Sequence, residues 1–218
     1  MLSLFEELFL LALDEDRGKT ASYAKKTLAY GLSGAMLAEL ALQGRVSVNE
    51  KNRLEPVGDE LTGDALLDET LEEIRTSEKT HKLTYWVSQF SERPKKLRER
   101  VGDLLVEKNV LSREEKRFFR QPPSGEAAQA AEPSKFEVKS RLRAMILANG
   151  ESDPRSLALL NLAAASELLG LIFTADELGF AGRRIHEEML RFALEDSVMQ
   201  TVEETEQAIS TVVEDDDD

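Results

Sequence analysis

The segment from Gly31 to Val46 has the pattern of a helix that ends at a glycine and continues directly into a short strand. Leu37 and Leu40 place apolar side chains at helical spacing, and the glycines and alanines around them leave room for a second helix to pack closely. Gly44 is placed as a C-terminal cap, because glycine readily adopts the left-handed conformation that ends many helices. The segment therefore predicts a helix and a strand joined by a tight cap.

The composition is typical of a helical protein and excludes any function that depends on cysteine. The chain has 218 residues, of which 41% are hydrophobic and only 6% aromatic, and it contains no cysteine. This length can bury a full core in one large domain or two small ones. The lack of cysteine excludes a disulfide framework, a thiol nucleophile and a thiolate metal site, and it fits a reducing compartment. No secretion signal is expected after Met1.

The net charge of −14 restricts the partners that the protein can have. It argues against nucleic-acid binding, which requires a basic surface, and against diffuse adhesion to anionic membranes. Any anionic ligand must be held by a local basic patch against an unfavourable overall field. Part of the negative charge lies in residues 214–218, which we expect to form an acidic tail.

The apolar periodicity predicts a mainly α protein, a single globular helical domain around an apolar central helix, with a small β-hairpin. The hairpin is expected between Arg45 and Val57, where two short runs flank a polar turn. The central helix is expected from Leu157 to Phe173, a run too short to cross a bilayer unaided, so we expect no transmembrane segment. Ser112, with glutamate three residues later, predicts the cap of another helix. The proline-rich segment at about 121–134 predicts a mobile loop, and the domain is expected to span residues 1–213.

The sequence contains no convincing catalytic or metal-binding motif. His186 begins like a zinc-protease helix, but Leu190 occupies the position of the required second histidine. There is no phosphate-binding glycine loop or nucleophile elbow. Adjacent acidic pairs such as Glu187 and Glu188 diverge on a helix and are better interpreted as solvated faces. We therefore expect a protein that is not an enzyme and that needs no metal or cofactor.

The strongest local electrostatic feature is the basic segment from Arg93 to Arg100. Lys95 and Arg98 are three residues apart, so they share a helix face. They also lie near the start of the expected helix, where free backbone N–H groups favour an anion. The alternative is a solvated basic face whose charges are paired with nearby acids.

The order and spacing of several motifs resemble the Golgi phosphoprotein 3 family, whose members are peripheral membrane proteins that recognise phosphatidylinositol 4-phosphate. The similarity extends over almost the whole chain. The motifs that carry it are Gly31–Val46, Thr62–Glu69, Trp86, Val101–Lys108 with the Val110–Leu111 pair, and Asp153–Phe173. The resemblance implies a mainly helical domain around a very apolar central helix, in agreement with the periodicity.

The resemblance also implies a shallow basic pocket for a phosphorylated headgroup. In the family, two basic residues of this pocket come from the later charged helix, and a tryptophan and an arginine come from the region of the Gly31 helix. The tryptophan position falls on Ala24 and the arginine position on Ser33, so both are altered here. The residues expected to bind the headgroup are Lys95, Arg98, Tyr23 and Lys25.

Two further departures from the family pattern bear on partners. The basic N-terminal extension that recruits vesicle-coat proteins in eukaryotic members has no counterpart in this sequence, and a polar, proline-rich segment stands near residues 121–133 in place of an apolar hairpin. These departures are typical of a prokaryotic or divergent member. The expected function is binding of phosphatidylinositol 4-phosphate or another anionic phospholipid headgroup, in the cytoplasm and on the cytoplasmic face of a membrane. The alternative is a protein-interaction adaptor that has lost lipid binding.

Overall fold

The computed structural model describes residues 1–13, 20, 24, 26–92, 94–114, 118–120, 133–148, 150–192 and 197–214. Its secondary structure is mainly helical, which confirms the expected fold class. The helices are α1 (Leu4–Ala12), α2 (Thr27–Leu42), α3 (Ala65–Thr76), α4 (Leu83–Ser91), α5 (Pro94–Glu107), α7 (Lys135–Leu147), α8 (Pro154–Ala165), α9 (Leu169–Ile172), α10 (Ala175–Phe192) and α11 (Ser197–Glu214). The strands are β1 (Val46–Val48), β2 (Leu54–Pro56), β3 (Ser112–Glu114) and β4 (Phe118–Arg120).

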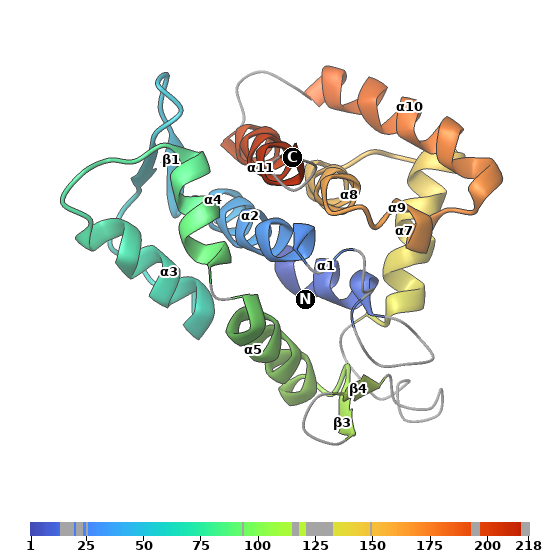
Figure 1. The fold of residues 1–218 in the computed structure, drawn as a ribbon, viewed down its shortest axis with the longest axis horizontal. Helices are drawn as coiled ribbons and strands as arrows, with labels where there is room; N and C mark the ends of the chain where they lie inside the picture. The colour runs from blue at the N-terminus through green and yellow to red at the C-terminus, as the bar shows by residue number, and fades with distance from the viewer. Residues whose placement is uncertain are drawn as a thin grey trace.

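Helix α2 lies in the middle of the fold and packs against α1, α4, α8 and α11 (Figure 1). Its glycines permit close approach, as the sequence predicts. A Cβ atom at Gly34 would overlap the side chain of Thr205 on α11, and one at Gly31 would overlap the hydroxyl of Ser166 after α8. Because interiors are packed without spare volume, any larger residue would push these helices apart.

The apolar segment from Leu157 to Phe173 is buried but is not one helix. Leu160, on α8, has no exposed surface, which confirms the expected burial. Helix α8 ends before Glu167, whose φ of 61° is left-handed, and the short helix α9 follows. The expectation of a continuous helix was wrong, because a glutamate gives no sequence signal for the left-handed cap that glycine or asparagine would give.

A two-stranded antiparallel hairpin follows each of the helices α2 and α5. The first hairpin, β1–β2, confirms the prediction from the sequence. The second, β3–β4, shows that the interpretation of Ser112 as a helix cap was wrong, since Ser112 pairs with Arg120 in the hairpin. Phe119 of this hairpin packs edge-on against Phe9 of α1, with ring centroids 5.8 Å apart. This distant contact favours the extended pairing over the helix that the local sequence would permit.

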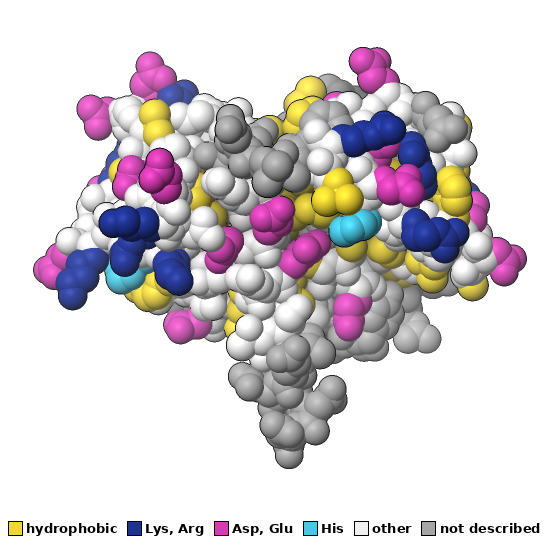
Figure 2. All heavy atoms as spheres, turned by 90° about the horizontal axis from the view of Figure 1, so that it is seen from above, with side chains coloured by type: hydrophobic (Ala, Val, Ile, Leu, Met, Phe, Trp, Pro, Cys, Tyr) yellow, Lys and Arg dark blue, Asp and Glu magenta, His cyan; other side chains and the backbone are white. Residues whose placement is uncertain are grey.

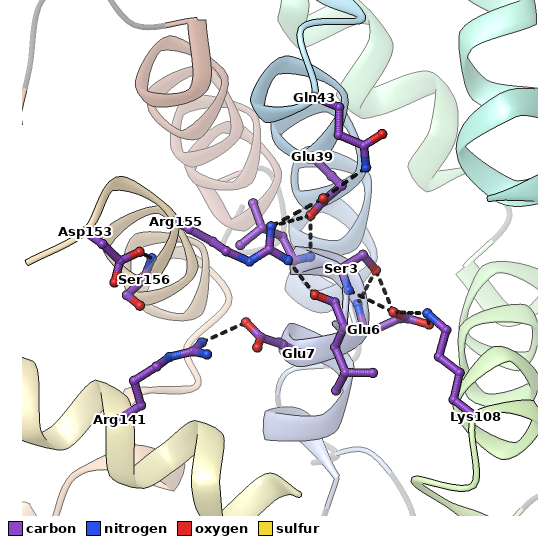
Figure 3. A network of polar contacts seen from close by, with 12 residues as sticks. Ser3, Glu6, Glu7, Glu39, Gln43, Lys108, Arg141, Asp153, Arg155 and Ser156 are labelled. Carbon is purple, nitrogen blue, oxygen red and sulfur yellow. Dashed lines mark hydrogen bonds and ion pairs between the residues drawn. The ribbon is translucent and has the colours of Figure 1, made fainter. Parts of the chain in front are cut away.

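Three carboxylates are buried around the start of the chain, and each has a cationic partner on another element (Figure 3). The ion pairs are Glu6–Lys108 at 2.6 Å, Glu7–Arg141 at 2.9 Å and Glu39–Arg155 at 3.0 Å. They connect α1 to the residue after α5 and to α7, and they connect α2 to α8. A buried carboxylate that loses its partner typically costs about 3–5 kcal/mol, so the first two pairs hold α1 in place and the third holds α8 against α2.

Residues 121–132 of the expected mobile loop, and residues 215–218 of the expected acidic tail, lie outside the described residues. Buried hydrophobic residues from Leu2 to Ala208 form one cluster. Among the described residues, no helix combines the length and apolarity needed to cross a bilayer.

Candidate anion-binding site

Helix α5 begins at Pro94 and carries the basic segment that the sequence singled out. Proline suits this position because the missing N–H would have no partner inside the helix. Lys95 and Lys96 follow in the first turn, which contains no acidic residue. The first-turn N–H groups and the positive end of the helix dipole add to these charges, so the start of α5 can hold an anion.

Arg98 lies one turn further along α5 and is half-buried. Its burial lowers the pKa of the guanidinium from its ordinary value, and the neighbouring carboxylate of Glu99 acts in the opposite direction. Arginine nevertheless stays charged at neutral pH. Because burial penalises the charged form, an anion that approached Arg98 would offset part of that penalty.

The structure describes only part of the expected headgroup site. Tyr23 and Lys25 lie outside the described residues, and the side chain of Lys95 is not described either. Of the four residues expected to bind the headgroup, Arg98 is therefore the one whose side chain can be placed.

The two altered family positions are both closed to solvent. Neither Ala24 nor Ser33 has exposed surface. The Ser33 hydroxyl donates a hydrogen bond to the carbonyl of Ala29, at 2.9 Å, within α2. An arginine at position 33 would need the surrounding helices to rearrange before it could reach a ligand. Sequence comparison alone does not reveal this closure, since it depends on the packing around α2.

A cleft of about 120 Å³ borders α5 on the side of Lys96 and Arg100, where α3 and α4 form the other walls. Arg100 donates two hydrogen bonds to the carboxylate of Glu69 on α3, at 2.6 and 2.8 Å. This fork holds α5 against α3. Sequence reasoning missed the cleft because its lining residues come from four helices, and the one local signal was the shared face of two basic residues four positions apart.

Charge of both signs is distributed over the upper face of the molecule (Figure 2). Lys and Arg side chains gather at the two sides of this view, and acidic side chains lie between them. Such a face offers no continuous basic surface for a polyanion. On this face, electrostatic capture of an anion would require a local group of cations.

The comparison with known proteins identifies the relationships of this chain. The model of the Golgi phosphoprotein 3 family matches residues 4–209, a span that includes both α2 and α5. The chain belongs to the Golgi phosphoprotein 3 family. This membership confirms the resemblance inferred from the motifs.

One relative is vacuolar protein sorting-associated protein 74 of Schizosaccharomyces pombe. The two chains are 33% identical over 138 residues, which cover 54% of this chain and 40% of the relative. The match thus spans less than half of the yeast protein. Membership of the Golgi phosphoprotein 3 family fixes the ancestry of the fold, whereas ligand and partners have to be argued from the residues of this chain.

Proposed function

We propose that this member of the Golgi phosphoprotein 3 family is a peripheral protein that binds phosphorylated lipid headgroups, of the phosphatidylinositol 4-phosphate type, at the start of α5. The observation that carries the proposal is the concentration of positive charge from Lys95 and Arg98 near a helix N-terminus, in a chain whose net charge is −14. Positive side chains at a helix N-terminus are repelled by the positive end of the helix dipole unless an anion compensates them. The protein would act on the cytoplasmic face of a membrane.

The roles of the residues follow from their chemistry. Lys95 supplies a point charge, and the first-turn N–H groups supply directional donors to phosphate oxygens. Arg98 supplies a planar fork that can bind a phosphate through two parallel hydrogen bonds. Tyr23 and Lys25, which precede α2 in the sequence, would complete the site.

Binding is expected to be weak and salt-sensitive. Each basic residue near an anionic surface contributes about 1 kcal/mol, and the altered positions Ala24 and Ser33 remove two of the family contacts. The overall negative charge of the protein opposes approach to the membrane. Raising the ionic strength should therefore release the protein, because exposed charges are screened beyond a Debye length of about 8 Å at physiological salt.

Co-sedimentation with vesicles tests the proposal. Phosphatidylcholine vesicles containing phosphatidylinositol 4-phosphate are compared with vesicles that carry the same total charge as phosphatidylserine. The double variant Lys95→Glu with Arg98→Glu should lose binding to the first kind. Lys51→Glu with Lys79→Glu is the matched control, since both lysines are exposed and neither belongs to α5 or to the segment before α2.

Each variant is first checked by thermal unfolding, because Arg98 is half-buried. If the glutamate substitution at Arg98 unfolds the protein, Lys95→Glu with Arg98→Gln replaces it. Normal vesicle binding by the folded variant, or equal binding to both kinds of vesicle, would show that the start of α5 is not a phosphoinositide site.

The burial of Ser33 favours a second candidate, a protein-interaction adaptor of the same fold that has lost lipid binding. In that case the wild-type protein should not sediment with either kind of vesicle, even at low salt. Sedimentation of the wild-type protein with the two kinds of vesicle therefore distinguishes the two functions.

A further inference from the structure

We propose that the cleft between α3, α4 and α5 binds a small zwitterion, an α-amino acid with an aliphatic side chain. The cleft lies on a different side of α5 from Arg98 of the headgroup site. Lys96 and Arg100 line the cleft, whereas Arg98, which lies between them in sequence, does not. Residues two apart on a helix point about 200° from each other, so the two sites do not share side chains.

The rim of the cleft carries charges of both signs, from Glu69, Glu73, Lys96 and Arg100. Arg100 and Glu69 are paired with each other through two hydrogen bonds. Lys96 and Glu73 also line the cleft, and neither side chain makes an ion pair or a hydrogen bond with any other residue that the structure describes. The positive charge of Lys96 lies close enough to contribute to lowering the pKa of Glu69, whose largest cause is the hydrogen bond from Arg100.

This arrangement selects a ligand with two opposite charges. A lone anion at Lys96 would also meet the carboxylates of Glu69 and Glu73, and a lone cation at Glu73 would meet the two cations. A ligand with a carboxylate and an ammonium group can satisfy Lys96 and Glu73 together. Charge complementarity of this kind serves specificity more than affinity.

The floor of the cleft is apolar. Met36, Leu66 and Leu97 line it and are 2%, 4% and 7% exposed, and the half-buried ring of Phe90 adds another apolar wall. The cleft has a volume of about 120 Å³. A branched four-carbon side chain has a similar size. Because Met36, Leu66 and Leu97 expose little surface, the ring of Phe90 would supply most of the apolar contact, and the rim charges would add to it.

The fluorescence of Trp86, the only tryptophan in the chain, can report on binding in the cleft. The ring of Trp86 stacks on Phe90 with centroids 5.5 Å apart, so its fluorescence should respond when the cleft is filled. Three probes of nearly the same shape are titrated. They are L-leucine, which is zwitterionic, L-leucinamide, which is cationic, and 4-methylpentanoate, which is anionic. L-Leucine should bind best, with a Kd of about 1 mM, and each singly charged probe about two- to fivefold more weakly.

Matched substitutions test each charge separately. Lys96→Met should abolish the preference for L-leucine over L-leucinamide, whereas Lys79→Met, on an exposed lysine outside the cleft, should leave it unchanged. Glu73→Gln should abolish the preference for L-leucine over 4-methylpentanoate. Its control is Glu72→Gln, on the neighbouring exposed residue of the same helix.

The methyl group of Met36, observed by NMR, gives a second measurement that does not depend on tryptophan. Equal affinity for the three probes would overturn the proposed zwitterion specificity. So would a response that neither Lys96→Met nor Glu73→Gln alters. If neither the fluorescence nor the Met36 signal saturates with L-leucine, the cleft is not an amino-acid site.

Discussion

Two helices, α2 and α5, each end in a left-handed residue and continue into an antiparallel hairpin. The left-handed residue is Gly44 after α2, with φ of 65°, and Asn109 after α5, with φ of 58°. In both, the next amide donates back to a leucine carbonyl inside the helix, from Arg45 at 2.8 Å and from Val110 at 2.9 Å. The chain therefore uses the same local device twice to turn a helix into a hairpin.

The two units fill their interiors differently. Counting from the left-handed residue, Leu37 and Gly102 are equivalent, and so are Leu54 and Phe119. The first unit buries two leucines at these positions. The second combines a glycine with a phenylalanine, and a Cβ atom added at Gly102 would overlap the ring of Phe119. One unit uses two medium side chains and the other uses a small and a large one.

Their surroundings also differ. Helix α2 is enclosed by α1, α4, α8 and α11, whereas the principal contacts of α5 are with α1 and α2 (Figure 1). With fewer close neighbours, α5 has room for its basic residues on one side and for the cleft on another. A shared local pattern thus produces a core element in one place and a candidate binding element in the other.

The largest expected effect comes from the equivalent buried leucines four residues before each cap. Leu40→Ala and Leu105→Ala each remove a side chain with no exposed surface, so each should cost about 2–5 kcal/mol. Leu40→Ala should cost more, because the helices enclosing α2 have less freedom to relax into the cavity. Urea unfolding of both variants gives the two values, and equal losses would contradict the claim that the units differ in enclosure.

The next largest effect is expected in the second unit, where the small Gly102 lies against the large Phe119. Gly102→Ala should destabilise the protein by about 1–3 kcal/mol, since the new methyl group meets the Phe119 ring. This loss should outweigh the gain in helix propensity. Adding Phe119→Leu should recover at least part of it, because that change restores the smaller side chain of the first unit. Additive losses in the double variant, measured in a mutant cycle, would refute the pairing.

The caps themselves should contribute less. Gly44→Ala should cost about 1 kcal/mol through its left-handed backbone alone, since nothing lies within 4 Å of the added Cβ atom. Asn109→Ala should cost less, because asparagine already carries a side chain there and keeps only part of the tolerance that glycine has. Thermal unfolding ranks the two variants. A larger loss at Asn109 would mean that its side chain does more than permit the turn.

The smallest effect is a gain. Glu167, after α8, has the same left-handed conformation, and the Leu168 amide donates to the Ala163 carbonyl at 2.8 Å, but no hairpin follows. Glu167→Gly should stabilise the protein by about 0.5–1 kcal/mol by removing backbone strain from an exposed position. An unchanged or lower melting temperature would show that the glutamate side chain stabilises the native state in another way.

The sequence by itself determined the helical class, the first hairpin and the glycine cap at Gly44, because each has a local signal in periodicity, turn residues or glycine placement. It also located the basic segment that begins α5. The family membership followed from motifs distributed along the chain and was confirmed by the match over residues 4–209.

Only the tertiary structure decided the second hairpin, the break at Glu167, the burial of Ser33 and the cleft beside α5. Each depends on residues that are distant in sequence and meet only after folding. Phe119 meets Phe9 and Gly102, and the lining residues of the cleft come from α2, α3, α4 and α5. Local propensity differs little between the possible conformations at such sites. The free energy of packing against distant elements therefore selects one of them.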